Sequence, residues 1–367
     1  MILRVSAVIF FLFAFAPVSV YADRGRLAEE FQVNLYRARV VEVADEIVIR
    51  DTVTQVLRVR VLNRDLRGHE TTVRNTLAYD ATNRPLRSGN RIVLHMEEDA
   101  DGTPVFFFYG YDRLVPFAVL FAFFAACVVA LGGLKGVRAL TALLLTIMLI
   151  MFVLVPLLLR GYNPIVLSVV VCVLSTIITC VICFGTGKKS FSAVLGVSGG
   201  LLIGGVIAHV FGIAARMAGL SHGDAQMLQY LPGGYMFDFR GLLFAGIIIG
   251  ALGACLDVAI SISSALTEIT AHNPSAEKKE IVRSGFNIGK DIMGSMINTL
   301  ILAYTGGSLA TILIFAGFGS GLSQIFNLES IAVEILRSVA GSLGLIFAIP
   351  ITIFAFVFLD KMKGRNT

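Results

Sequence analysis

The chain has 367 residues, of which 56% are hydrophobic and only 15% are charged. An average soluble protein carries about 25% charged residues, so the composition excludes an ordinary soluble enzyme and favours an integral membrane protein. Residues 23–112 hold 13 arginines, no lysine and 15 acidic residues, whereas the rest holds 17 basic and 10 acidic residues. The excess positive charge therefore belongs to the apolar part, where it reports membrane orientation and not nucleic-acid binding.

The first 22 residues have the pattern of a secretory signal. Arg4 precedes a mostly apolar run, and Val20 and Ala22 stand at the −3 and −1 positions of a cleavage site. We predict a signal peptide over residues 1–22, with an uncleaved signal anchor as the alternative.

Residues 23–112 predict a small extracytoplasmic β domain. Short runs rich in Val, Arg and Thr alternate in polarity and are separated by polar turns. Five such runs are typical of an OB-like barrel or a sandwich. The expected strands cover residues 31–42, 54–62, 70–77, 90–96 and 104–109.

Residues 113–367 predict an α-helical integral membrane bundle of about seven transmembrane helices with a cytoplasmic C-terminus. The apolar residues fall in blocks of about 20, the length that crosses a hydrocarbon core about 30 Å thick. With the β domain outside, the inner links and tail carry 11 basic residues, including all eight lysines, and the outer links carry four arginines. This distribution follows the positive-inside rule. The expected spans are 114–131, 139–159, 164–184, 192–215, 242–267, 289–313 and 338–360.

Polar residues inside these spans are costly and therefore mark candidate functional positions. They concentrate on one face of the fifth span and one face of the sixth, at helical spacings of three and four residues. Asp257 and Asn298 are expected near the same depth, and Glu268 is expected to face Asn287 or Asp291. The predicted polar seam consists of Asp257, Ser261, Ser264, Glu268, Asn287, Asp291, Ser295 and Asn298.

Two interpretations of these residues stay open. The seam either binds an ion or proton at Asp257, or its side chains only hold two helices together. Rows of glycine, which let helices approach closely, are expected to pack the fourth span against the fifth, with gliding surfaces for alternating access as the alternative. These glycines are Gly196, Gly200, Gly204, Gly246 and Gly250. The segment 275–286 between the two polar spans is expected to form an amphipathic helix on the membrane surface.

No P-loop, dinucleotide fingerprint, catalytic triad or H-E-x-x-H motif occurs in the sequence. We therefore expect no cofactor and no enzymatic activity, and the sequence leaves a metal site open.

Several stretches resemble one family of bacterial membrane proteins. They are residues 241–261, His272-Asn273-Pro274, residues 284–294 and residues 298–304. Over about 113–360 the chain is similar to the YibE/F family, and the likeness is weaker over the β domain. The resemblance implies a multi-pass protein of the bacterial cytoplasmic membrane and places Asp257, Asn287, Asp291 and Asn298 in its most recognisable motif. It implies no settled activity.

Two functions follow as hypotheses. The first is a transporter or permease that moves an ion or small solute through the lipid bilayer, with the seam centred on Asp257. The second is a non-transporting membrane component whose β domain binds an envelope protein or ligand. Assembly into a homo-oligomer is compatible with both.

Overall fold

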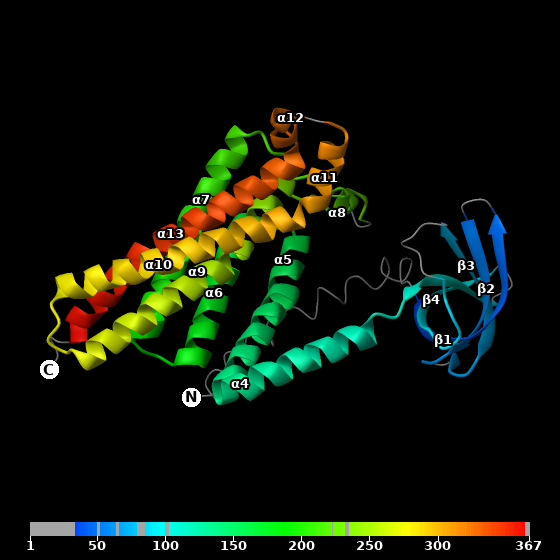
Figure 1. Cartoon of the computed structure of the whole chain (residues 1–367), viewed down its shortest axis with the longest axis horizontal. Coiled ribbons are helices and arrows are strands. Elements are labelled where there is room, and N and C mark those ends of the chain that lie inside the picture. Colours follow the sequence, from blue (N-terminus) through cyan, green and yellow to red (C-terminus); the bar gives the residue numbers. More distant parts are fainter. Residues whose placement is uncertain are drawn as a thin grey trace. The chain divides into compact units, whose positions relative to one another are not determined.

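The computed structural model describes residues 34–49, 52–63, 66–78, 85–99, 103–221, 223–231, 235–319 and 321–363. The predicted signal segment, residues 1–22, lies outside them. The chain divides between Cys127 and Val128 into two compact units: a β unit, which also includes the first turns of the long helix after the strands, and a helical unit. Each unit is described by itself (Figure 1).

The β unit is a single antiparallel sheet of five strands in the order β3-β2-β1-β4-β5. The neighbours β4-β1-β2-β3 form a Greek key, and contacts between β3 and β5 curl the sheet into a half-barrel. Four strands lie within about two residues of the predicted positions, and the first extends seven residues beyond its predicted end at residue 42. They are β1 (Asn34–Ile49), β2 (Thr52–Val61), β3 (Glu70–Ala78), β4 (Arg91–Glu98) and β5 (Pro104–Tyr111).

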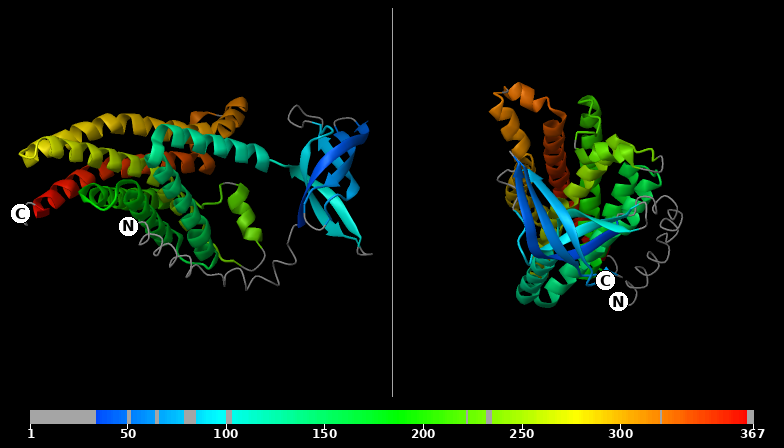
Figure 2. Two further views of the ribbon diagram at one scale, coloured as in Figure 1. Left: turned by 90° about the horizontal axis from the view of Figure 1, so that it is seen from below. Right: turned by 90° about the vertical axis from the view of Figure 1, so that its right-hand side faces the viewer.

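Strand β1 makes this curvature possible because it pairs on both sides. Its first residues pair with β4, and residues 38–49 pair with β2, with register shifts between Val40 and Glu42 and between Val43 and Asp45. Such bulges bend a strand and increase its twist. The strong coiling of the strands is visible in Figure 2. Alternate side chains fill the interior, among them Leu57, Ile92 and Leu94.

The helical part of the chain begins with one long helical run, residues 114–159, of which residues 114–127 fall in the same compact unit as the strands. The run comprises α4 (Leu114–Leu149), the π-helix η2 (Ile150–Leu154) and α5 (Val155–Leu159). At 1.5 Å per residue its 46 residues would extend about 69 Å, twice the thickness of a hydrocarbon core. The backbone leaves the helical conformation at Gly133, with φ 52° and ψ −135°. The break falls between the predicted spans 114–131 and 139–159. Gly136, which follows the break, packs against the backbone of Val128, which precedes it.

Within the described residues, five helices are long and apolar enough to cross a membrane, and a sixth crossing is obtained if α10 (Lys278–Gly307) and α11 (Leu309–Gly317), bent by 57°, count as one. The seven predicted spans are therefore not confirmed by this count. The long run is one of the five. The others are α6 (Pro164–Phe184), α7 (Lys188–Ala214), α9 (Phe239–His272) and α13 (Glu329–Lys363).

Helix α7 is central, since it packs against α13, α9 and α6, while α10 packs against α13 and α9. The connecting segments contain the short helices α8 (Gly223–Met227), η3 (Leu228–Tyr230) and α12 (Leu322–Phe326). Two expectations on helix limits were wrong. Residues 278–286 are the first turns of α10 and not a separate surface helix, and α13 begins nine residues before the predicted span at 338.

Candidate functional site

One face of α9 exposes only glycine, small and polar residues along its membrane-crossing part. Between Leu242 and Thr270 these exposed positions recur every three or four residues, apart from one interval of seven that contains the half-buried Ser264, so they form one stripe. No large apolar side chain is exposed anywhere in Phe239–His272. We call this face the α9 stripe; it consists of Gly246, Gly250, Gly253, Asp257, Ser261 and Glu268.

The adjoining helix α10 has the same character over its first 22 residues. Every exposed position from Lys278 to Thr299 is polar, charged or glycine. Asn287, Asp291 and Asn298 are all exposed. Ser295 is also exposed, and its hydroxyl donates to the carbonyl of Ile292 in its own helix at 2.9 Å.

Other helices of the unit expose a different surface. Helix α7 exposes Phe191, Leu202 and Phe211, and α13 exposes Phe354 and Phe358. Large apolar side chains are what a lipid-facing helix presents to hydrocarbon. The exposed faces of α9 and α10 are thus chemically distinct from the rest of the bundle.

Two contacts fix the register between the antiparallel helices α9 and α10. A Cβ on Gly250 would stand 2.8 Å from the Tyr304 hydroxyl, and a Cβ on Gly289 would stand 3.5 Å from Ile262 Cδ1. In an antiparallel pair, each step forward along α9 corresponds to one step back along α10. Counting from Gly250 and Tyr304 places Asp257 level with residue 297, and counting from Ile262 and Gly289 places it level with residue 294. Asn298, the predicted neighbour of Asp257 in depth, is one residue beyond residue 297.

The same register describes the rest of the seam. Glu268 lies level with residues 283–286, one residue short of the predicted partner Asn287, and Asp291 lies level with residues 260–263, which include Ser261. The seam therefore runs from the middle of α9 to the turn between α9 and α10. This turn is flanked by Lys278 and Lys279, and we call it the lysine end of the bundle.

A buried serine pair lies outside the predicted seam. Ser263 on α9 and Ser192 on α7 are both fully buried, and their hydroxyl oxygens are 3.0 Å apart. This pair is a polar contact that links α7 to α9. Ser263 lies off the polar face, so a search for one-sided periodicity passes over it.

The glycine row of α7 packs against α13 and not against α9. Gly200 faces the backbone of Gly344, Gly204 faces Ala340, and Gly196 faces Thr352. The two glycines of α9 that were predicted to pack against α7, Gly246 and Gly250, do not contact it among the residues that the structure describes. Gly246 has no atom of the described residues within 4 Å of a Cβ built on it, and Gly250 meets only Tyr304.

An ion pair at the opposite end was also missed. Arg337, which was assigned to an outer link, lies inside α13 and pairs with Glu334 at 2.7 Å. Its guanidinium lies over the ring of Tyr304 on α10, 5.7 Å from the ring centroid. The signal was present in the sequence as Glu and Arg three residues apart, but the helix had to begin earlier for them to face one another.

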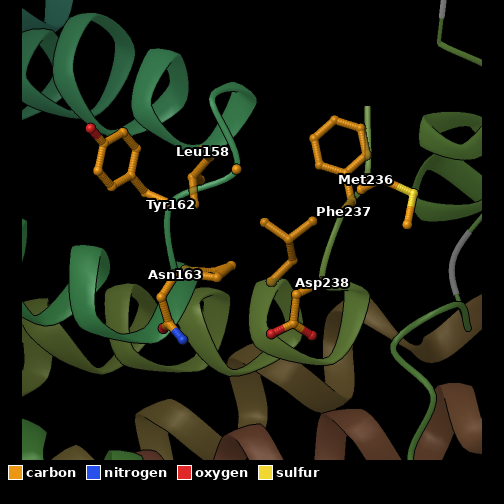
Figure 3. A pocket seen from close by; sticks show the side chains of 9 residues that line it. Leu158, Tyr162, Asn163, Met236, Phe237 and Asp238 are labelled. Atoms are coloured by element: carbon orange, nitrogen blue, oxygen red, sulfur yellow. The ribbon is translucent and has the colours of Figure 1, made fainter. Parts of the chain in front are cut away.

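A surface pocket of about 210 Å³ lies where α6 and α9 begin, as Figure 3 shows. Two of the polar side chains that line it already cap helices. Asn163 Oδ1 accepts from the N–H groups of Ile165 and Val166, and Asp238 Oδ1 accepts from that of Gly241. No residue of the α9 stripe lines this pocket, so it is separate from the seam. In the described part of the chain, no three His, Cys, Asp or Glu side chains gather as a metal site.

The apolar helices and the polar seam define a multi-helix membrane protein with a separate β half-barrel. The chain belongs to the YibE/F-like protein family, whose model matches residues 120–361. No curated protein and no solved structure matches the chain.

Proposed function

We propose that this protein is a membrane transporter or permease that moves an ion or small polar solute along the exposed faces of α9 and α10. The observation that carries the proposal is the α9 stripe itself. It places a carboxylate, Asp257, in the middle of an apolar helix and surrounds it with glycine and serine where a lipid-facing helix has Leu or Phe.

The energetic argument concerns what covers this face. A carboxylate at the centre of the bilayer costs about 2.5–3.5 kcal/mol or more when lipid surrounds it, and exposed glycines gain nothing from contact with hydrocarbon. Water that enters along α9 and α10 removes both penalties. Asp257 is then a binding point for a proton or a cation, and Asn298, less than one turn away in depth, supplies a neutral oxygen or amide.

The proposed orientation has the β unit outside the bacterial inner membrane and the lysine end inside. Lys188 pairs with Asp360 near the end of α13, and Lys135, beyond the break at Gly133, is close enough to Lys189 to interact with it electrostatically. The basic links thus gather at one end. The proposal has seven spans if the long run counts as two crossings, divided at Gly133, and α10 and α11 together count as one. A reporter fused after residue 363 is then expected to be cytoplasmic.

The test is proton flux in proteoliposomes that enclose a pH-sensitive dye, together with the content of metal ions in cells that overproduce the protein. We expect Asp257→Asn to abolish the flux, or the change in metal content, while the protein still inserts and elutes as the parent does. Asp224→Asn, a change to an exposed carboxylate of the short connecting helix α8, is the matched control and retains most of the activity. Equal fluxes for Asp257→Asn and the parent would rule the proposal out.

A second candidate rests on the β unit. The β unit is an antiparallel half-barrel in which β3 contacts β5, and this arrangement supports our expectation of an OB-like, partly open barrel, a form that binds ligands on its surface. It is a compact unit with its own core, which favours a role in binding an envelope partner. Deletion of residues 23–110 would abolish activity under this candidate, while Asp257→Asn would leave activity intact.

A further inference from the structure

Tyr304 covers the α9 stripe at a single point. A Cβ on Gly250 would stand 2.8 Å from its hydroxyl oxygen, whereas the described residues leave the space beside Gly246 and Gly253 open. Gly250 lies seven residues before Asp257, which is about 10 Å along the helix. The tyrosine therefore interrupts the open face between Asp257 and the end of the bundle at which α9 begins.

A charged pair on a third helix holds this tyrosine in place. The Arg337 guanidinium lies over the Tyr304 ring, 5.7 Å from its centroid, and Arg337 Nη1 is 2.7 Å from Glu334 Oε1. The side chains of Arg337 and Glu334 are only 25% and 14% exposed, and a cation over an aromatic ring attracts it more strongly when water is excluded. Helices α9, α10 and α13 thus meet at one side chain.

The helix that carries Tyr304 ends beside it at a pair of glycines. The Tyr304 carbonyl accepts a hydrogen bond from the Ser308 N–H at 3.1 Å, and α10 ends one residue earlier, at Gly307. The following helix α11 departs at 57° (Figure 1). Gly306 and Gly307 have open space around them in the described structure. A pair of glycines at a helix break is a position where a large change in φ and ψ is absorbed.

We propose that Tyr304 is a gate that closes the route to Asp257 from the end where α9 begins, with Arg337 and Glu334 as its latch and residues 306–308 as its hinge. The structure is the state that is closed at this end and open along α9 and α10 toward the lysine end. The proposal rests on the proposed function, because a gate has meaning only where a solute path exists.

The experiment measures the accessibility of introduced cysteines to a charged, membrane-impermeant thiol reagent. Gly246→Cys and Gly253→Cys place thiols on either side of Tyr304, and both positions have room for a Cβ. The background carries Cys127→Ser, which removes the exposed native thiol. Reagent is added separately to each face of the membrane, using intact cells and inverted vesicles.

With Tyr304 present, we expect reagent from the α9-start face to modify Gly246→Cys and not Gly253→Cys, and reagent from the lysine end to modify Gly253→Cys. A closed gate leaves the open state populated at about 10% or less. Tyr304→Ala should therefore raise modification of Gly253→Cys from the α9-start face about tenfold or more. Glu334→Gln should give a smaller rise in this modification, because it weakens the ion pair with Arg337 but keeps the Tyr304 ring in place.

Two controls keep the result interpretable. The rate at Gly246→Cys, which lies outside the gate, reports whether reagent reaches the α9 stripe equally in each variant, and elution at the parent's position reports that the variant is folded. Tyr162→Ala removes an exposed tyrosine of the surface pocket and should leave both rates unchanged. Rapid modification of Gly253→Cys from the α9-start face with Tyr304 intact would overturn the proposal, and so would an unchanged rate in a folded Tyr304→Ala.

The outcomes separate the gate from the proposed function. If Asp257→Asn retains full flux while the cysteine rates behave as expected, the gate stands and the role of Asp257 in transport fails. If Asp257→Asn abolishes flux while Tyr304→Ala changes no rate, the transporter stands and the gate fails.

Discussion

Gly200 on α7 and Gly344 on α13 lie backbone to backbone, so that a Cβ on Gly200 would stand 2.5 Å from the Gly344 carbonyl oxygen. Such an approach gains van der Waals contact along the two helices, which is the principal attraction between helices in lipid. The approach lies within the apolar core that α7 and α13 share.

The first prediction concerns this contact. Gly200→Ala should lower the free energy of unfolding by about 1–3 kcal/mol, because the backbone of α13 has to shift to admit the methyl group. Thermal unfolding of the detergent-solubilised protein measures the change. Gly246→Ala is the matched control, since its Cβ meets open space, and should shift stability by less than about 0.5 kcal/mol. Equal effects of the two substitutions would contradict the packing described here.

The second prediction concerns the break in the first long helical run. Gly133 has φ 52° and ψ −135°, a conformation that L side chains rarely adopt, whereas the neighbouring Gly132 has no such constraint. Gly133→Ala should cost about 1–3 kcal/mol. Gly132→Ala should be nearly neutral or stabilising, because alanine favours a helix over glycine. Comparison of the two midpoints of unfolding decides the matter, and a neutral Gly133→Ala would show that the chain continues as a straight helix.

The third prediction is a coupling energy between Ser192 and Ser263. Double-mutant cycles of polar pairs in membrane helices average about 0.6 kcal/mol, and we expect a value of that size or somewhat larger because both hydroxyls are fully buried. The cycle uses the two single alanine variants and the double variant. Ser192 with Ser342 is the control pair, since the Ser342 hydroxyl donates to the carbonyl of Ser338 in its own helix. A coupling that is the same for both pairs would refute the interhelical bond.

The fourth prediction is a pH dependence in the β unit. Hydrogen bonds from the Arg60 guanidinium, at 2.6 and 2.9 Å, hold the pKa of Glu70 below its ordinary value of 4.5. A carboxyl whose folded pKa is lowered contributes stability above its unfolded pKa and loses it as the pH falls through the folded value. Stability should therefore decline below about pH 4.5, and Arg60→Gln should weaken this decline.

NMR titration of the Glu70 carboxyl in the full chain checks the cause directly. Arg60→Gln should move its pKa upward toward the ordinary value, while Arg87→Gln, a change to an exposed arginine elsewhere in the unit, should leave it in place. The interaction is at the surface, so the effect on stability is small and the titration is the sharper measurement.

Local patterns in the sequence predict much of this fold. Alternating polarity locates all five strands, because one side of each strand faces the interior of the half-barrel. Helical spacing places Asp257 and Ser261 on one face of α9, and that face is exposed in the structure. Both results follow from periodicity within a single element, which needs no knowledge of its partners.

The sequence predicts less well which helices pack against one another and where they begin. The glycine row of α7 predicts a closely packed face, but glycine has no side chain that would specify the partner helix. In the structure the partner is α13 instead of α9. The segment after Asn273 has the polarity of a surface helix, yet a helix that simply extends out of the membrane has the same polarity. The contact of Arg337 with Tyr304 depends on α13 starting at Glu329, which no cap residue signals clearly.

The continuity of α9 and α10 has a mechanical consequence. Between Asp257 and His272 the helix is unbroken, a rod of about 22 Å at 1.5 Å per residue. Helix α10 returns beside it without interruption from Lys278 to Asn298. A stiff pair of rods transmits displacement instead of absorbing it. A molecule that pushed or pulled on the tip at Asn273 and Pro274 would therefore displace the groups around Asp257 through this pair of helices.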